Sequence, residues 1–155
     1  MARVQLYCPD ESSLVYIAEN LRHADADELR ATHGADVDFK QCLRAAVAIS
    51  EEVHCAYTAV GEPFAVFGIA PALIDGQGIP WMLGTDIIAL YGREVVALSR
   101  AHVARWGLKY PCLFNYVDAR NLRSIVWLRR TGFSILDAAP YGVEGLPFHR
   151  FERCM

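Results

Sequence analysis

Two polar residues stand where a ligand could be met, at the end of the apolar stretch 111–117. Asn115 lies inside this predicted strand and Asp118 directly follows it. The carboxyl end of a buried strand often borders a cleft, where an amide and a carboxylate can bind a substrate or move a proton. Asp118 could equally well cap the helix that follows. We therefore take Asn115 and Asp118 as the candidate catalytic pair.

Two histidines are further candidates for acid–base chemistry. His54 follows Glu51 and Glu52 and could act as a base, but it begins a predicted strand, where a surface position is the simpler interpretation. His102 falls on the apolar side of a predicted helix, which favours a hydrogen-bonded core histidine over a catalytic one.

The cysteines and histidines indicate no metal centre. No Cys-x-x-Cys pair occurs, and the histidines do not share ligand spacing on any one element. We predict no metal and free thiols in a reducing compartment. The five cysteines are Cys8, Cys42, Cys55, Cys112 and Cys154.

Composition sets the class of protein. The chain has 155 residues, of which 54% are hydrophobic and 21% charged, which excludes intrinsic disorder and predicts one domain over residues 1–155. The longest strongly apolar stretch, 63–74, is shorter than the ~20 residues that span a bilayer. We therefore expect no membrane contact.

Charge is unevenly distributed along the chain. Residues 1–77 carry 5 basic and 12 acidic side chains, whereas residues 78–155 carry 10 and 6. The densest basic group lacks the neighbouring aromatic residues that stack on bases, so we interpret it as a protein interface and disfavour nucleic acid. Its members are Arg120, Arg123, Arg129 and Arg130.

Hydrophobic periodicity predicts an α+β chain in which a mostly antiparallel sheet contains one parallel crossover. The crossover is the strand 79–88, the helix 93–106 closed by Gly107, and the strand 111–117. Around this unit we expect Trp81, Phe114, Ile125 and Trp127 to be buried. The other predicted strands are 3–7, 53–60, 64–70, 134–138 and 148–153, and the other helices follow Asp10 or cover 25–32, 38–52 and 122–130, the last with Leu122, Ile125 and Leu128 facing inward.

The order of these elements resembles the GNAT acetyltransferase fold. The motif Asn121-x-x-Ser124-x-x-Trp127-Leu128-x-x-x-Gly132-Phe133 is similar to the GNAT helix that ends in Gly-Phe. A closer resemblance, from about Glu62 to Phe151, is to the internal virion protein A family of short-tailed (podovirus-type) phages, which is implied to be GNAT-like. It rests on the segments Pro63-Phe-Ala-Val-Phe-Gly-Ile, Trp81-Met-Leu-Gly-Thr-Asp, Leu113-Phe-Asn-Tyr-Val-Asp and the helix from Asn121 to Phe133.

The GNAT resemblance implies where acetyl-CoA would bind, namely at Gly84, Gly92, Arg93 and Asn121. A GNAT enzyme usually holds the pyrophosphate with a loop of paired glycines, and here the loop 88–94 contains Gly92 alone. The usual proton donor is a tyrosine four residues before the glycine of Gly-Phe, and that position is Leu128. From these two departures we expect neither cofactor binding nor acetyl transfer.

Three functions remain open at the level of the sequence. The first is a phage virion or assembly protein that uses a GNAT-like domain as a packing module. Its partners would be other phage structural proteins and further copies of itself, and its location the virion or the assembling particle in the host cytoplasm. The alternative is an N-acetyltransferase that transfers an acetyl group from acetyl-CoA to an amine. The third is a DNA-contacting accessory protein.

Overall fold

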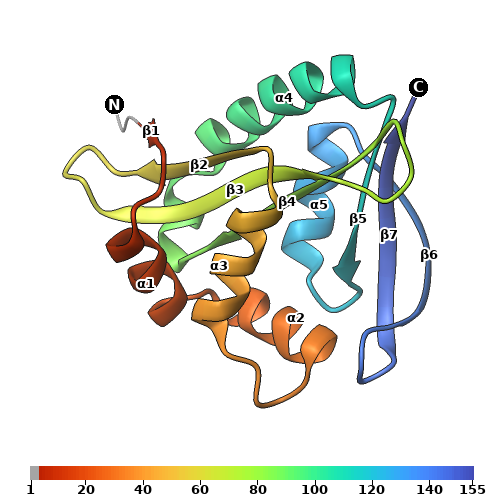
Figure 1. Cartoon of the computed structure of the whole chain (residues 1–155), viewed down its shortest axis with the longest axis horizontal. Coiled ribbons are helices and arrows are strands. Elements are labelled where there is room, and N and C mark those ends of the chain that lie inside the picture. Colours follow the sequence, from red (N-terminus) through yellow and green to blue (C-terminus); the bar gives the residue numbers. More distant parts are fainter. Residues whose placement is uncertain (1–3) are drawn as a thin grey trace.

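A computed structural model describes residues 4–155 of the chain, and a seven-stranded sheet is its centre (Figure 1). The strand order is β1-β2-β3-β4-β5-β7-β6, with β4 and β5 parallel and every other neighbouring pair antiparallel. The strands are β1 (Gln5–Tyr7), β2 (Glu52–Tyr57), β3 (Pro63–Pro71), β4 (Gln77–Gly84), β5 (Cys112–Asp118), β6 (Ser134–Tyr141) and β7 (Leu146–Cys154).

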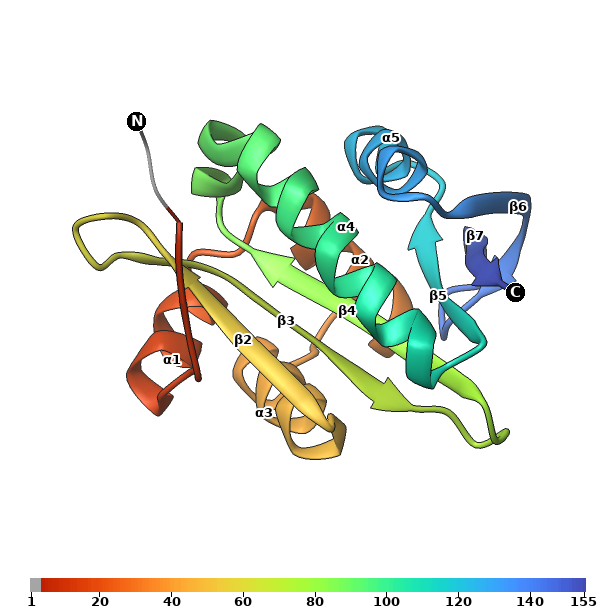
Figure 2. The same cartoon turned by 90° about the horizontal axis from the view of Figure 1, so that it is seen from above.

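Helices cover both faces of the sheet (Figure 2). The helices α4 and α5 lie on one face, and α1 and α3 lie on the other, while α2 crosses the carboxyl ends of β4 and β5. The bounds are α1 (Glu11–Glu19), α2 (His23–His33), α3 (Phe39–Ile49), the 3₁₀ turn η1 (Asp86–Tyr91), α4 (Gly92–Lys109) and α5 (Leu122–Thr131).

Local capping explains why three helices start where the sequence predicts. The side chains of Asp10, Asp38 and Asn121 each accept hydrogen bonds from backbone N–H groups in the first turns of α1, α3 and α5. Gly132 ends α5 with a positive φ of 104°, a conformation that glycine adopts without steric cost. The predicted α+β fold with one parallel crossover is confirmed.

Four predicted details of the crossover and of the helix that follows it are wrong. The strand from Ile79 ends at Gly84 instead of Ile88, because Thr85 caps the η1 turn by accepting from the N–H of Ile87. Gly107 does not close the following helix, which continues to Lys109. Leu122 is 69% exposed instead of facing inward.

The fourth correction concerns the predicted core. Of the four residues expected to be buried, Ile125 is buried, whereas Trp81, Phe114 and Trp127 keep part of their surface accessible. The largest cluster of buried residues lies under α4 and α5 and includes Val103, Trp106, Leu113 and Leu128. The opposite face is filled by a smaller cluster that includes Leu14, Ile17, Leu43 and Val66.

The free-thiol prediction fails for one pair of cysteines. Cys112 and Cys154 are direct register partners on β5 and β7, and the structure joins them by a disulfide. Cys8, Cys42 and Cys55 are free thiols. Among the helices of residues 4–155, none has the length and apolar character needed to cross a bilayer.

Candidate functional site

The parallel strands β4 and β5 separate soon after they meet. Their ladder contains only two residue pairs, Gln77 with Cys112 and Gly78 with Leu113. Beyond Gly78, β4 continues to Gly84 and β5 continues to Asp118 with no further ladder pair between them. The side chain of Asn115 bridges the start of the gap by donating to the carbonyl oxygen of Pro80 at 2.9 Å. Some backbone groups in the gap are already occupied, since the N–H groups of Tyr116 and Asp118 donate to side chains and the backbone of Gly84 bonds to α2 and its cap. The remaining backbone groups of the two facing edges are available for a ligand.

A cleft of about 1480 Å³ passes through this gap. Its lining includes Val95 and Ser99 of α4 on one face of the sheet, and Cys42 and Ala46 of α3 on the other. Helices α4 and α3 cover opposite faces of the sheet (Figure 2). Because both helices line the cleft, it reaches both sides of the sheet. A ligand entering beside α4 and α5 could therefore meet a second ligand that enters beside α2 and α3.

The start of α4 borders the cleft at Gly92. A Cβ atom built on Gly92 meets nothing within 4 Å, so this position opens onto free space. Arg93 is exposed and lies outside the cleft lining. Gly84 also lies outside the lining, and its backbone is occupied, since its N–H donates to Asp25 and its carbonyl accepts from Arg22.

The Gly-Phe helix α5 presents Trp127 and Leu128 to the cleft. Leu128 is buried in the main core, so no acid stands at the position where GNAT enzymes usually carry a tyrosine. The indole nitrogen of Trp127 is buried and has no hydrogen-bond partner in the described part of the chain. An unpaired buried donor costs about 1–3 kcal/mol, which a bound acceptor would relieve.

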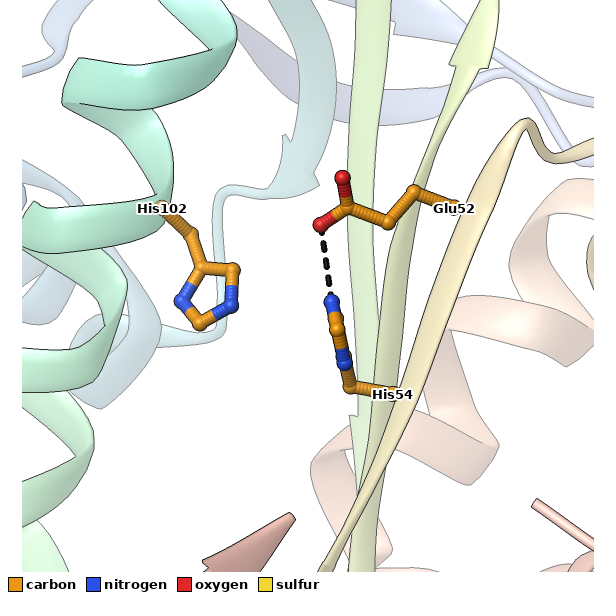
Figure 3. A group of neighbouring side chains, drawn as sticks. All are labelled: Glu52, His54 and His102. Atoms are coloured by element: carbon orange, nitrogen blue, oxygen red, sulfur yellow. Dashed lines mark hydrogen bonds and ion pairs between the residues drawn. The ribbon is translucent and has the colours of Figure 1, made fainter. Parts of the chain in front are cut away.

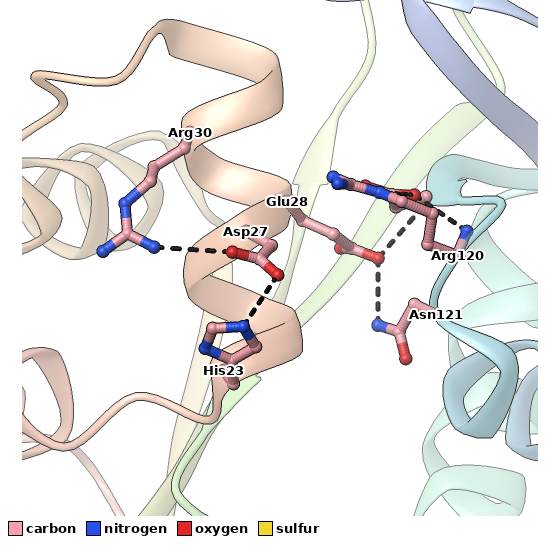
Figure 4. Close-up of polar contacts among 7 residues, drawn as sticks. His23, Asp27, Glu28, Arg30, Arg120 and Asn121 are labelled. Atoms are coloured by element: carbon pink, nitrogen blue, oxygen red, sulfur yellow. Dashed lines mark hydrogen bonds and ion pairs between the residues drawn. The ribbon is translucent and has the colours of Figure 1, made fainter.

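Glu28 of α2 is the cleft residue with the most altered acid–base chemistry. Its Oε1 accepts from the backbone N–H of Asp118 at 3.1 Å and from the amide of Asn121 at 3.0 Å (Figure 4). Burial raises the pKa of the Glu28 carboxyl to about 7, and the negative charges of Asp25 and Asp118 add to the shift. A carboxyl group with this pKa can take a proton near neutral pH.

The sequence analysis did not single out Glu28. The structure places the polar residues that it did single out in different environments. Asn121 and Asn115 line the cleft, whereas Asp118 does not. Asp118 is 2% exposed at its side chain and forms an ion pair with Arg120 at 2.6 Å. Burial raises the pKa of Asp118, but the hydrogen bonds from Arg120 outweigh it and the net shift is downward. Asp118 therefore positions Arg120 and the turn before α5.

A second polar group joins β2 to α4, where His54, His102 and Glu52 come together (Figure 3). One ligand atom from each lies within 4.8 Å of the others, the arrangement of a possible metal site. His54 Nε2 lies 2.7 Å from Glu52 Oε2, and His102 Nδ1 lies 2.8 Å from the Leu98 carbonyl. These contacts bring together both histidines that the sequence analysis considered.

The carboxylate of this group already has strong partners. Arg105 binds both oxygens of Glu52, and the indole N–H of Trp106 donates to Oε2 at 3.1 Å. Together with His54, these donors lower the pKa of Glu52 to about 2, and Arg105 makes the largest contribution. Burial lowers the pKa of His102. We interpret the group as a strut between β2 and α4, because Arg105 already neutralises the carboxylate.

Comparison with solved structures identifies the fold as that of the GNAT N-acetyltransferases. A putative acetyltransferase from Acinetobacter baylyi has a TM-score of 0.73 at 13% identity, covering 100% of this chain and 94% of its own. Ribosomal-protein-alanine N-acetyltransferase from Brucella melitensis has 0.71 at 14%, covering 97% and 99%. AAC(6')-Ib in complex with ribostamycin and coenzyme A has 0.68 at 20%, covering 97% and 93%. No family model and no curated protein matches the chain.

These findings correct the leading sequence interpretation. The structural neighbours are N-acetyltransferases, which favours the enzyme alternative over a non-catalytic phage packing module. No family-model or curated match links the chain to phage proteins. The expectation that no cofactor binds also loses its support, since neighbours of this fold were solved with coenzyme A.

Proposed function

We propose that this protein is an N-acyltransferase that uses an acyl-CoA thioester as donor and a primary amine as acceptor. The observation that carries the proposal is the cleft through the β4–β5 gap, which joins the α4–α5 face to the α2–α3 face. Transfer between two ligands requires that both reach one point, and a channel across the sheet provides it.

Three features of the α4–α5 side fit coenzyme A. The separated edges of β4 and β5 offer backbone groups to a pantetheine arm, and Gly92 leaves room at the start of α4. The unpaired indole N–H of Trp127 is a donor for an amide carbonyl. Arg123 and Arg130 line the cleft on α5 and have no ion-pair partner within residues 4–155, so they are available for phosphates.

One feature differs from the usual phosphate cradle. The η1 turn runs directly into α4, so the helical segment after β4 starts at Asp86 with Thr85 as its cap, and not at Gly92. We therefore assign phosphate binding mainly to the arginine side chains of α5. The single glycine at position 92 keeps the side of the helix open for the cofactor.

The chemistry of the site follows from the residues on the α2 side. When bound, acyl-CoA would supply an activated acyl carbon. As the amine nitrogen forms its bond to that carbon and the carbon–sulfur bond breaks, Glu28 accepts the proton that leaves the nitrogen. Leu128 offers no proton to the departing sulfur, so that proton comes from water. Asn121 and the N–H of Asp118 hold the Glu28 carboxylate in place.

A matched pair of leucine substitutions on α4 tests the cofactor side. Gly92→Leu places a side chain into the cleft, whereas Ala97→Leu places the same side chain on an exposed position of α4 outside it. We expect calorimetry to show coenzyme A binding by the wild type and by Ala97→Leu, and binding at least about tenfold weaker for Gly92→Leu. Absence of binding to the wild type at millimolar coenzyme A contradicts the proposal.

A further inference from the structure

A group of aromatic side chains forms one wall of the cleft on its α2 side. Tyr116 of β5 and Tyr141 of β6 stack with ring centroids 4.3 Å apart, and Phe148 of β7 extends the group at 5.0 Å from Tyr141. All three line the cleft, and Tyr116 follows the bridging residue Asn115 on β5. The wall opposite is formed by α2 and α3, which contribute apolar residues such as Leu29, Ala45 and Ile49 together with polar ones such as Thr32, His33 and Gln41.

The carboxyl groups on this side differ in their partners and in their exposure. Four carboxyl groups line the cleft, namely Asp25, Glu28, Asp38 and Asp86. Asp25 is paired with Arg22 at 2.7 Å, and Asp38 is occupied by the first-turn amides of α3. Asp86 is exposed at the cleft edge. Glu28 is thus the one partly buried carboxyl of the lining that has no ion pair among the described residues.

From this distribution we infer that the acceptor is a primary arylalkylamine, a molecule with one amino group on an aromatic body. The inference rests on the proposed function and names the acceptor for the same site. Glu28 binds the amino group, and the stack of Tyr116 and Tyr141 contacts the ring of the substrate. Stacked or edge-on aromatic pairs contribute about 0.5–1.5 kcal/mol beyond the burial of their area.

The same residues disfavour acceptors with several positive charges. A second or third ammonium group of a polyamine would lie near Arg22, Arg120 or the aromatic wall, unless it reached the exposed carboxylates of Asp38 and Asp86. Attraction to these two carboxylates is weak because solvent screens exposed charges. Burying an unpaired cation is costly, and a nearby guanidinium adds repulsion. Two neighbours of this fold carry names that refer to an aminoglycoside and to spermidine. We expect this chain to discriminate against both kinds of acceptor.

The inference is tested by measuring the rate of thiol release from acetyl-CoA, first with 2-phenylethylamine and then separately with spermidine as the acceptor. We expect kcat/KM for 2-phenylethylamine to be at least about tenfold higher. Tyr116→Ala should raise KM for 2-phenylethylamine at least about fivefold and leave KM for n-butylamine within about twofold, because the short amine has no ring to stack. Tyr16→Ala, on the exposed part of α1 and outside the cleft, is the matched control.

The possible results separate the acceptor class from the proposed function. Turnover that favours spermidine overturns the arylalkylamine inference and leaves the acyltransferase proposal in place. If neither amine is acylated, calorimetry of each amine with the protein decides. Tighter binding of 2-phenylethylamine, lost in both Tyr116→Ala and Tyr141→Leu, supports the inference, whereas equal or tighter binding of spermidine overturns it.

Discussion

Glu28 and Asp27 are adjacent acids on α2 with opposite environments. Asp27 points to solvent and contacts His23 and Arg30, whereas Glu28 points into the cleft toward Asn121 (Figure 4). Only Glu28 combines burial with nearby negative charge, and its pKa rises to about 7 as a result. Asp27 can therefore serve as the control in experiments that test Glu28 as the base.

Substitution of Glu28 tests its role as the base. A base acts when deprotonated, so kcat/KM of the wild type should rise with pH and level off above about pH 7. Glu28→Gln should lower kcat/KM by roughly 10²–10⁴-fold and abolish that rise. Asp27→Asn should keep both the rate and the pH profile of the wild type. An unchanged pH profile in Glu28→Gln assigns the base to another residue.

Trp127 and Trp106 form a second informative pair of residues. The indole N–H of Trp127 has no partner, whereas that of Trp106 donates to Glu52. We expect Trp127→Phe to weaken coenzyme A binding about two- to tenfold, the value of one hydrogen bond, with little loss of stability. Trp106→Phe should lower the free energy of unfolding by about 1–2 kcal/mol. Urea denaturation and calorimetry measure the two effects, and equal affinity in Trp127→Phe removes the indole from the binding site.

Sequence could not have found Glu28, and the reason lies in how the site is assembled. The segment 23–33 contains three acids among polar residues, and nothing in their spacing distinguishes one from another. Only the crossing of α2 over the ends of β4 and β5 gives Glu28 its partners, which are 90 and 93 positions away. Asn115 and Asn121 were accessible to sequence reasoning, because both lie beside a predictable strand end.

Element boundaries show the same division between local and distant causes. The caps at Asp10 and Asn121 and the stop at Gly132 depend on neighbours within four residues, and the sequence predicts them correctly. The end of β4 depends on the local cap at Thr85 and also on distant residues, because Asp25 and Arg22 occupy the backbone of Gly84. The apolar run 79–88 therefore changes from strand to 3₁₀ turn with no break in hydrophobicity.

The strut between β2 and α4 has a testable pH dependence. Arg105, His54 and Trp106 lower the folded-state pKa of Glu52 to about 2. A depressed carboxyl pKa stabilises the fold above the unfolded pKa of about 4.3, and the contribution is lost as pH falls toward 2. Glu52→Gln should therefore cost about 1 kcal/mol at pH 6, a value limited by solvent screening of the half-exposed Arg105.

The difference between Glu52→Gln and the wild type should shrink as the pH of the denaturation experiment falls from 5 to 3. Glu144→Gln, exposed between β6 and β7, is the control and should show a change within about 0.5 kcal/mol at every pH. A cost at pH 3 as large as that at pH 6 means that packing, and not the ion pair, holds β2 to α4.

At the scale of the whole molecule, the sheet consists of two parts that meet along a short seam. Strands β1–β4 and strands β5–β7 share only two ladder pairs at Gln77 and Gly78. Elsewhere the parts are joined by side-chain and loop contacts, such as Glu28 with Asn121, and by the turn between β6 and β7, whose Val143 N–H donates to Thr32. A ligand in the gap would contact both parts at once and tie them together.

Hydrogen exchange tests whether coenzyme A joins the two parts. A ligand at 100 times its dissociation constant stabilises the native state by about 2.7 kcal/mol, and the local effect is largest where the ligand covers exchangeable amides. We expect slower exchange in residues 79–84 and 114–118, which form the two sides of the gap, and a smaller change in residues 52–57 of β2. Binding seen by calorimetry with no slowing in either gap segment would place coenzyme A elsewhere.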